Sequence, residues 1–323
     1  MPALPDRTVS RVLDTCLGVR TDETVVLLVD ADTDPSVMAG LSVGLDQRNA
    51  QARVITVPRY DVPGSEPTPE AAQALLDSDA AIELTSVFIG SSQARRSATD
   101  AGRRYVAMPG VTVDTFRLGG PYDVDFDALA HTVNTVALLW ESADTYRITT
   151  PAGTDLAGSI RGRVGRRLTG IARDPGSYMA PPDIESGTAP VESSTSGVVV
   201  IDGDYLFMGA GPSVSASVLH LSDGMLVHTE GDEAARLTET IARCDDPRMT
   251  NLAEVAVGLN PQGSVCGVAM ETESTLGSAH IAFGNSIAYG GTVDAVAHLD
   301  CVMQSATVFF DDVPRIVEGV VVP

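Results

Sequence analysis

Lysine is missing from this 323-residue chain, and all 21 of its basic side chains are arginine, against 43 acidic ones. The formal net charge is −22. Nucleic acids and anionic membranes bind positively charged surfaces, so neither is an expected partner. Because 44% of the residues are hydrophobic, the acidity does not indicate disorder. We expect a folded protein with an acidic surface, which either a salt-adapted host or GC-rich coding sequence would produce.

Long apolar runs and targeting signals are also absent. No stretch reaches the roughly 18 apolar residues that a membrane-spanning helix needs. The first residues, Met-Pro-Ala-Leu-Pro-Asp-Arg, have no signal-peptide pattern. The four cysteines form no CxxC pair and lie in apolar contexts, which favours reduced structural thiols. We therefore expect a cytoplasmic protein that is long enough for two domains.

Two common catalytic signatures find no support in the sequence. There is no GxxxxGK[ST] loop, and the first predicted strand runs into an acidic turn over 30–35 that would repel a pyrophosphate. A GxSxG match occurs at 40–44, but it lies inside the predicted helix over 36–49 and not at the strand-to-helix turn where this motif carries the nucleophile of many serine hydrolases. We expect neither a nucleotide cofactor nor a nucleophilic serine of that kind.

The first part of the chain alternates between helical and strand-like patterns. Short β-branched runs predict strands at 24–30, 52–58, 80–85 and 104–108. Segments with helical spacing predict helices at 7–20, 36–49, 69–77, 92–101 and 126–142. Strands that alternate with helices in this way are typical of βαβ units and an open parallel sheet. We therefore predict an α/β domain over residues 1–145.

The remaining residues have a different texture, because β-type runs separated by Gly, Asp and Asn recur up to the C-terminus. A strand, a turn and a second strand are expected over 146–156. Further strands are expected at 197–202, 205–208, 215–221, 224–229, 253–259, 280–283 and 306–310. We predict a β-rich α+β domain over residues 146–323.

Histidine and carboxylate residues lie in the otherwise apolar segments of this second domain. His298 and Asp300 are two residues apart on a predicted strand, so both side chains lie on one face. His280 begins another strand, and Glu254 lies inside an apolar run, where an unpaired carboxylate is costly. Glu185 lies in a proline-rich segment that we predict to be a turn-rich loop. Each residue alone is more often structural, but together they suit one or two divalent ions of the Zn, Mn, Co or Fe type.

The order of these residues resembles the thermophilic dinuclear metalloaminopeptidases of the aminopeptidase T, or leucyl aminopeptidase, type. The resemblance rests on P-x-x-E-x-x-x-A-P around Glu185, L-A-E-V-A-V-G-L-N-P around Glu254, A-H-I-A-F-G around His280 and H-L-D at 298–300. It covers most of the chain, including the turn over 150–156. The resemblance implies two bound metal ions, a small-molecule or short-peptide substrate and a homodimer.

The sequence departs from that family in three respects. The resemblance implies a carboxylate ligand shortly before the first histidine, but Glu271 and Glu273 lie nine and seven residues ahead of His280. It also implies a catalytic tyrosine seven residues after that histidine, whereas Tyr289 lies nine residues after it. The chain is also shorter, and in length it resembles a related branch that includes 2,5-dihydroxypyridine 5,6-dioxygenase. That resemblance implies a single Fe(II) in a site of two histidines and an aspartate.

Hydrolysis of an amide or N-terminal peptide bond is the main functional hypothesis. Two ions of Zn, Co or Mn would activate a water, held by Glu254, His280, His298, Asp300 and either Glu185 or Glu271. Glu185 would move the proton to the leaving amine, and Tyr289 would stabilise the oxyanion.

The alternative is a mononuclear Fe(II) ring-cleaving dioxygenase that acts on a dihydroxypyridine-like N-heterocycle. Its metal would be held by His280, His298 and either Asp300 or Glu254. Carboxylates beyond this triad would favour the dinuclear site. A third hypothesis is a binding protein with a purely structural ion. The other histidines, His131, His220 and His228, lack such neighbours, and we predict structural roles for them.

Overall fold

The computed structural model describes residues 3–61, 63–209 and 211–322, and the chain divides into two compact units. The first unit contains Met1–Ala128 and Leu168–Asp183, and the second contains Leu129–Arg167 and Ile184–Pro323. Residues 168–183 thus follow the predicted domain boundary at 145 in sequence but belong to the first unit. That boundary remains a prediction.

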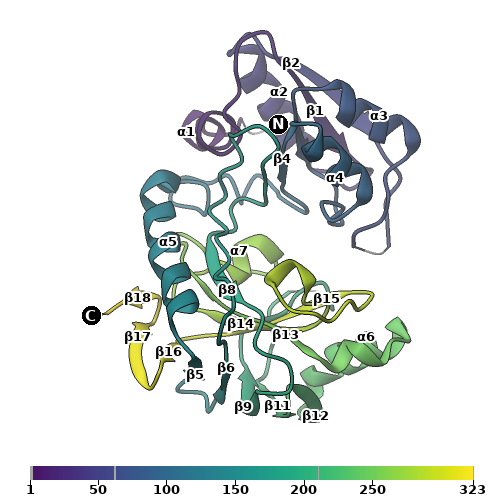
Figure 1. Cartoon of the computed structure of the whole chain (residues 1–323). Helices are drawn as coiled ribbons and strands as arrows, with labels where there is room; N and C mark the ends of the chain where they lie inside the picture. The colour runs from purple at the N-terminus through teal and green to yellow at the C-terminus, as the bar shows by residue number, and fades with distance from the viewer. Residues whose placement is uncertain (1–2, 62, 210, 323) are drawn as a thin grey trace. The chain divides into compact units, whose positions relative to one another are not determined.

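The first unit is built around a parallel sheet whose strand order is β2-β1-β3-β4-β7 (Figure 1). All neighbouring strands in it are parallel, which confirms the predicted open parallel sheet. The strand bounds are β1 Thr24–Val29, β2 Gln51–Thr56, β3 Ala80–Glu83, β4 Arg104–Ala107 and β7 Tyr178–Met179. Strand β7 is two residues long and was not predicted, because so short a segment has no readable pattern.

Helices cover both faces of this sheet. The bounds are α1 Asp6–Ser10, which continues as a π-helical turn over Arg11–Cys16, then α2 Pro35–Asp46, α3 Pro69–Asp77 and α4 Gln93–Asp100. The chain moves from β1 to β2 in one direction and then back past β1 to β3 and β4. Right-handed crossovers in opposite directions place α2 on one face and α3 and α4 on the other. Asp34, Thr68 and Ser92 cap these three helices through their side chains.

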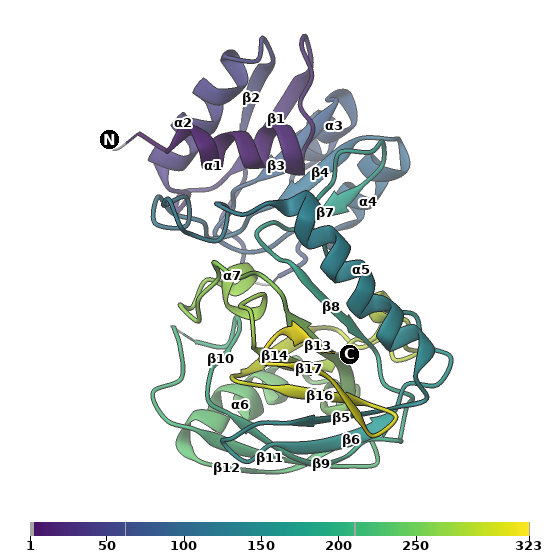
Figure 2. The ribbon, with the colours of Figure 1, turned by 90° about the vertical axis from the view of Figure 1, so that its left-hand side faces the viewer.

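The second unit contains two antiparallel sheets (Figure 2). One has eight strands in the order β12-β11-β9-β6-β5-β16-β17-β18, and the other has five in the order β10-β15-β14-β13-β8. The eight-stranded sheet is made of β5 Thr145–Thr149, β6 Asp155–Ser159, β9 Ser196–Ile201, β11 Ser217–Ser222, β12 Met225–Glu230, β16 Thr307–Phe310, β17 Val313–Val317 and β18 Val320–Val321. The five-stranded sheet is made of β8 Glu185–Thr188, β10 Asp204–Tyr205, β13 Leu252–Gly258, β14 Ala279–Gly284 and β15 His298–Met303.

Helix α5, Phe126–Ser142, has the predicted bounds, and its last turns pack on the eight-stranded sheet. Trp140 is fully buried against Phe310 and Tyr146, with ring centroids 4.7 and 6.3 Å away. The helices α6, Ala235–Cys244, and α7, Ala269–Glu273, were not predicted. Among the described residues, no helix combines the length and the apolar character needed to cross a bilayer.

The sequence interpretation of Glu185 as part of a turn-rich loop is wrong. Glu185 begins β8, which pairs antiparallel with β13 at the edge of the five-stranded sheet. The tetrapeptide Glu-Ser-Gly-Thr has no apolar alternation, so its strand conformation comes from pairing with β13 and not from its own pattern. Strand β10 is also shorter than the run predicted over 205–208.

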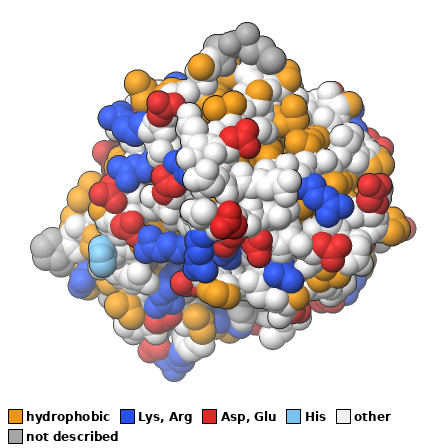
Figure 3. Space-filling view, turned by 90° about the horizontal axis from the view of Figure 1, so that it is seen from above, with side chains coloured by type: hydrophobic (Ala, Val, Ile, Leu, Met, Phe, Trp, Pro, Cys, Tyr) orange, Lys and Arg blue, Asp and Glu red, His pale blue; other side chains and the backbone are white. Residues whose placement is uncertain are grey.

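Surface acids pair with arginines in both units, as in Arg173–Asp127 at 2.8 Å and Arg147–Asp155 at 2.7 Å. On the face drawn in Figure 3, acidic and arginine side chains lie interspersed. Exposed pairs of this kind contribute little stability individually.

Candidate metal centre

The five-stranded sheet carries the candidate ligands on one face. Glu254 of β13 pairs with Ala282 of β14, and Ala282 pairs with Asp300 of β15. Side chains of residues paired across antiparallel strands project to the same side, so Glu254 and Asp300 share a face. His280 pairs with Ala256. His280 lies two residues from Ala282, and Ala256 lies two residues from Glu254. His280 therefore projects from the same face.

Glu185 and His298 join this face from the two outer positions. Glu185 of β8 pairs with Gly258, and His298 of β15 pairs with Gly284. The positions between the five ligands are thus Ala or Gly: Ala256, Gly258, Ala282 and Gly284. Small residues here leave the face to the ligand side chains. The opposite face carries buried apolar residues such as Val255, Ile281 and Cys301.

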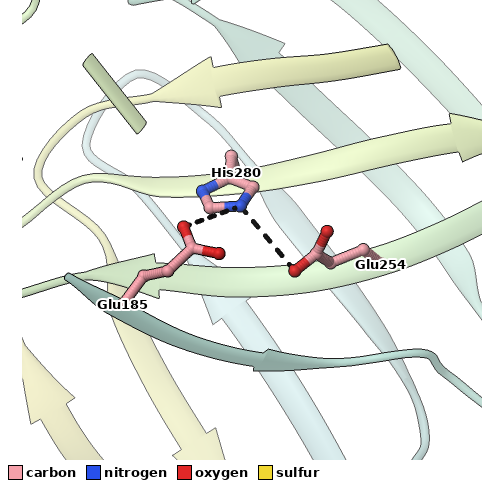
Figure 4. A group of neighbouring side chains, drawn as sticks. All are labelled: Glu185, Glu254 and His280. Atoms are coloured by element: carbon pink, nitrogen blue, oxygen red, sulfur yellow. Dashed lines mark ion pairs between the residues drawn. The ribbon is translucent and has the colours of Figure 1, made fainter. Parts of the chain in front are cut away.

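A first cluster contains Glu185, Glu254 and His280, each with one potential ligand atom within 4.8 Å of the other two (Figure 4). The Nε2 atom of His280 lies 3.3 Å from Glu185 Oε2 and 3.9 Å from Glu254 Oε1. All three side chains are at most 2% exposed. Two carboxylates and an imidazole therefore converge in a volume shielded from water.

A second cluster contains Glu254, His298 and Asp300. His298 Nε2 lies 3.0 Å from Glu254 Oε2 and 3.2 Å from Asp300 Oδ1. Its Nδ1 donates a hydrogen bond to the carbonyl oxygen of Asn285 at 2.8 Å, because a carbonyl can only accept. This bond fixes the ring so that Nε2 faces the carboxylates. Glu254 joins the two clusters, with one oxygen toward each histidine.

The charges of the second cluster favour a bound cation. Burial alone would lower the pKa of His298, but the charges of Asp300 and Glu254 and their hydrogen bonds outweigh burial and raise that pKa well above its usual value. Burial would raise the pKa of Asp300, yet the charge and hydrogen bond of His298 lower it. A metal ion at Nε2 would displace the His298 proton and would be held by the same carboxylates.

Two buried atoms support the fit of a metal ion to these residues. Glu254 Oε1 and His280 Nδ1 have no hydrogen-bond partner among the described residues. Unsatisfied buried polar atoms are costly, and a divalent cation between the clusters would provide the missing partner of Glu254. Imidazole and carboxylate donors suit Zn, Mn, Co and Fe. The residues present therefore fit a divalent metal.

Tyr289 also reaches the ligand face, from a 3-10 turn over Ile287–Tyr289. Its ring stacks on that of His298, with centroids 4.8 Å apart and an interplanar angle of 11°. Burial, followed by the charges of Glu254 and Glu185, raises the pKa of Tyr289 well above its usual value, so the phenol is neutral. A role for Tyr289 in stabilising an oxyanion remains a prediction.

Glu271 is the one predicted ligand that the structure does not bring together with the others. It is buried in α7 and accepts a hydrogen bond from the Ser264 hydroxyl at 2.7 Å. Among the described residues, it belongs to neither cluster. Glu273 is different, because its carboxylate lies within 4.8 Å of that of Glu185. The sequence offered both glutamates, but a five-residue helix has no period from which to choose between them.

Sequence reasoning missed Asn285, whose carbonyl orients His298. A backbone contact of this kind has no side-chain signature that a sequence could show. Among the described residues, the three histidines predicted to be structural lie outside both clusters, and His220 Nε2 donates a hydrogen bond to the Glu230 carboxylate at 2.8 Å.

Comparison with known proteins gives a match over nearly the whole chain. The model of the family described as NicX, 2,5-dihydroxypyridine 5,6-dioxygenase, matches residues 7–323. The structure is similar to 2,5-dihydroxypyridine dioxygenase from Pseudomonas putida KT2440, with a TM-score of 0.79, 18% sequence identity and coverage of 98% of this chain and 96% of that one. It is also similar to wild-type AmpT from Thermus thermophilus, with a TM-score of 0.71, 16% identity and 98% coverage of both chains.

At these identities the two solved structures show a shared fold. No curated protein sequence matches the chain. The resemblance found in the sequence, including its dioxygenase branch, is confirmed.

Proposed function

The chain belongs to the NicX, 2,5-dihydroxypyridine 5,6-dioxygenase, family, and from this premise we propose that it uses dioxygen to open the ring of a dihydroxypyridine-like N-heterocycle. The observation that carries the proposal is the family match over residues 7–323, which includes the strands bearing His280, His298 and Asp300. Two histidines and one carboxylate on one side of a metal leave positions open for substrate and dioxygen.

In this proposal, His280 of the first cluster and His298 and Asp300 of the second would hold one metal ion between the two clusters. Fe(II) bound there would supply the redox chemistry that lets dioxygen react with an electron-rich ring. The Asn285 carbonyl and the stacked Tyr289 ring hold the His298 imidazole in one orientation. Glu254 is fully buried on the same face, and its carboxylate would accept a proton from a ring hydroxyl of the substrate.

The substrate would approach from the side of His298. Its side chain is 23% exposed and that of Asp300 is 10% exposed, whereas Glu185, Glu254 and His280 are at most 2% exposed. The buried side would exclude water from the reacting groups, and low local polarity strengthens the interactions of the carboxylates with a cation.

Hydrolysis, the main hypothesis from the sequence, is the second candidate. One observation favours it: Glu185 and Glu254 lie with the histidines, which gives carboxylates beyond a triad and enough donors for two ions. Family membership favours the ring-cleaving alternative, because the matched family is a dioxygenase family.

The experiment that tests the proposal compares two metal loadings of one preparation. Protein stripped with a chelator and reloaded with Fe(II) without oxygen is given 2,5-dihydroxypyridine and then oxygen. We expect uptake of about one dioxygen per substrate, with loss of the ring absorbance. In parallel, protein loaded with Co²⁺ is given aminoacyl anilides. Amine release without oxygen uptake in the first arm would overturn the proposal in favour of hydrolysis.

A further inference from the structure

Arg166 lies beside the edge of the sheet that carries the ligands. Its backbone N–H donates to the carbonyl oxygen of Gly187 in β8 at 2.8 Å, and its own carbonyl accepts from the Ser186 hydroxyl at 2.7 Å. Gly187 pairs with Ala256, which pairs with His280, so Gly187 lies in the row of this histidine on the ligand face. Gly187 is buried, and a Cβ atom there would lie only 2.4 Å from Ala256 Cβ, so β8 packs closely on β13 beside Arg166.

The Arg166 guanidinium approaches the ligand face over an aromatic ring. Its central carbon lies 5.9 Å from the ring centroid of Tyr289, within the range of a cation–π contact. Tyr289 in turn stacks on His298 at 4.8 Å. Arg166 is exposed, so its guanidinium remains accessible to a ligand. A positive charge is therefore placed beside the most exposed metal ligand.

Among the described residues, the guanidinium of this arginine makes no ion pair and no hydrogen bond, and it lies over the Tyr289 ring. Its neighbours in sequence are engaged. Arg163 donates to the carbonyl oxygens of Gly290 and Pro190 and to Glu192. Arg167 donates to Glu141 at 2.7 Å and to Asn134 at 3.1 Å. In a chain with 43 acidic residues and 21 arginines, an arginine without a carboxylate partner beside this site is available to an anion.

The charge of the site indicates what such an arginine would do. The three carboxylates of Glu185, Glu254 and Asp300 carry three negative charges, and one divalent ion leaves one of them uncompensated. A negatively charged ligand approaching a partly buried site of this kind is repelled unless a further cation lies near it. The planar guanidinium matches the two oxygens of a carboxylate and also binds a single anionic oxygen.

We propose that Arg166 is the substrate-recognition residue of this site, and that the substrate is an aromatic ring with an anionic oxygen substituent that pairs with the Arg166 guanidinium. The substituent is either a carboxylate or an ionised ring hydroxyl. The inference rests on the proposed function in one respect, since it takes the metal-binding face as the place where the ring is bound.

Binding of two matched probes to protein loaded with Zn²⁺, which is redox-inert, tests this inference without turnover. The probes are 3-hydroxybenzoate, an anion, and 3-hydroxybenzamide, its neutral counterpart, measured by isothermal titration calorimetry. We expect the wild type to bind the anion about tenfold more tightly, as for a charge-assisted pair. Arg166→Gln should reduce this preference to within about twofold, and Arg166→Lys should restore part of it because lysine keeps the charge but lacks the planar fork.

Arg167→Gln is the matched control, because it removes the same charge one residue away from a side chain that pairs with Glu141. This variant should keep the preference for the anion. An equal preference in the wild type and in Arg166→Gln would exclude a carboxylate as the partner of Arg166, and an affinity for 4-nitrophenol that is also equal in the two proteins would overturn the inference. So would equal weakening of both probes with loss of bound zinc in Arg166→Gln, because that result would mean that Arg166 only supports the Tyr289 ring.

A third 3-hydroxybenzoate analogue separates the two anionic substituents. The ring oxygen of 3-methoxybenzoate cannot ionise. If the wild type binds 3-methoxybenzoate as tightly as 3-hydroxybenzoate, Arg166 pairs with the carboxylate. A 4-nitrophenol arm, with an acidic hydroxyl and no carboxylate, assigns it to an ionised hydroxyl if its affinity falls in Arg166→Gln. Failure of the proposed function gives a different pattern, since absence of oxygen uptake with Fe(II) and 2,5-dihydroxypyridine would leave the Arg166-dependent anion preference intact.

Discussion

Glu83 in the first unit and Glu254 in the second are both fully buried carboxylates on strands, but they have different neighbours. Glu83, at the end of β3, accepts hydrogen bonds from the Ile89 N–H at 2.7 Å, the Tyr105 hydroxyl at 2.9 Å and the Thr85 hydroxyl at 3.1 Å. Glu254 faces two imidazoles and two other carboxylates, and its Oε1 has no hydrogen-bond partner among the described residues.

The difference shows how one residue type serves structure in one place and prepares a binding site in another. Neutral donors fixed by the backbone can stabilise a buried carboxyl group in either protonation state. Ligand-type neighbours leave a negative charge that needs a cation. Burial alone therefore does not identify a functional glutamate, whereas burial together with the chemistry of its neighbours does.

The largest expected effect comes from making the same substitution at both glutamates. Glu254→Gln removes the carboxylate shared by the two clusters, so we expect metal affinity to fall by at least about 100-fold. Glu83→Gln should leave metal content unchanged, because Glu83 belongs to neither cluster among the described residues. Elemental analysis after dialysis against limiting metal measures both. Full metal content in Glu254→Gln would remove the distinction between the two residues.

The pH dependence of the free energy of unfolding tests the role of Glu83. Burial, partly offset by the bonds from Ile89, Tyr105 and Thr85, raises the pKa of Glu83 from 4.5 to about 7. A pKa that is raised in the folded state means that the folded chain binds the proton more tightly than the unfolded chain does. Protonated Glu83 therefore contributes about 3 kcal/mol to the free energy of unfolding. This contribution is fully present below about pH 4.5 and is lost as the pH rises to about 7.

Urea unfolding of the wild type and of Glu83→Gln between pH 4.5 and 8 measures this contribution. The free energy of unfolding of the wild type should decline more steeply with rising pH than that of the variant, in which the position cannot ionise. Parallel curves for the two proteins would mean that Glu83 does not titrate in this range.

The smallest expected effect concerns Tyr289. Tyr289→Phe keeps the ring that stacks on His298, so metal affinity should change by no more than about twofold. Oxygen uptake in the proposed reaction should change equally little, whereas an oxyanion role in hydrolysis predicts a loss of about 100-fold in amide cleavage. Initial rates in the two assays distinguish these outcomes. A large loss of oxygen uptake would give the phenol a part in ring cleavage.

The alternating elements of the first unit could be predicted because each leaves a local signal. The β-branched run of β1 and the capped, periodic segment of α3 are readable over a few residues, and α3 has the predicted bounds. Strand β8 could not be predicted, because Glu185–Thr188 becomes a strand only through its pairing with β13. The helix α7 was missed because a five-residue segment is too short to show a helical period.

The candidate ligands could be predicted from charge in unexpected places. Glu254 and His280 lie within apolar runs, where an ionisable side chain needs a partner, and the structure brings both together with Glu185, His298 and Asp300. Glu271 was a candidate because the resemblance implies a carboxylate ligand before His280, but position along the chain does not determine the direction of a side chain. Arg166 had no signal of its own, since its position depends on the ring of Tyr289.

The ligands come from four strands, β8, β13, β14 and β15, which are separated in the chain by loops and by the helices α6 and α7. Neighbouring ligands become adjacent only when these strands pair, so the unfolded chain has no comparable site and the sheet must form before metal is bound. A metal ion would therefore be acquired by an already folded pocket. Which metal the protein carries in the cell then depends on the metals available after folding and on their relative affinities for this pocket, in addition to the identity of the ligands.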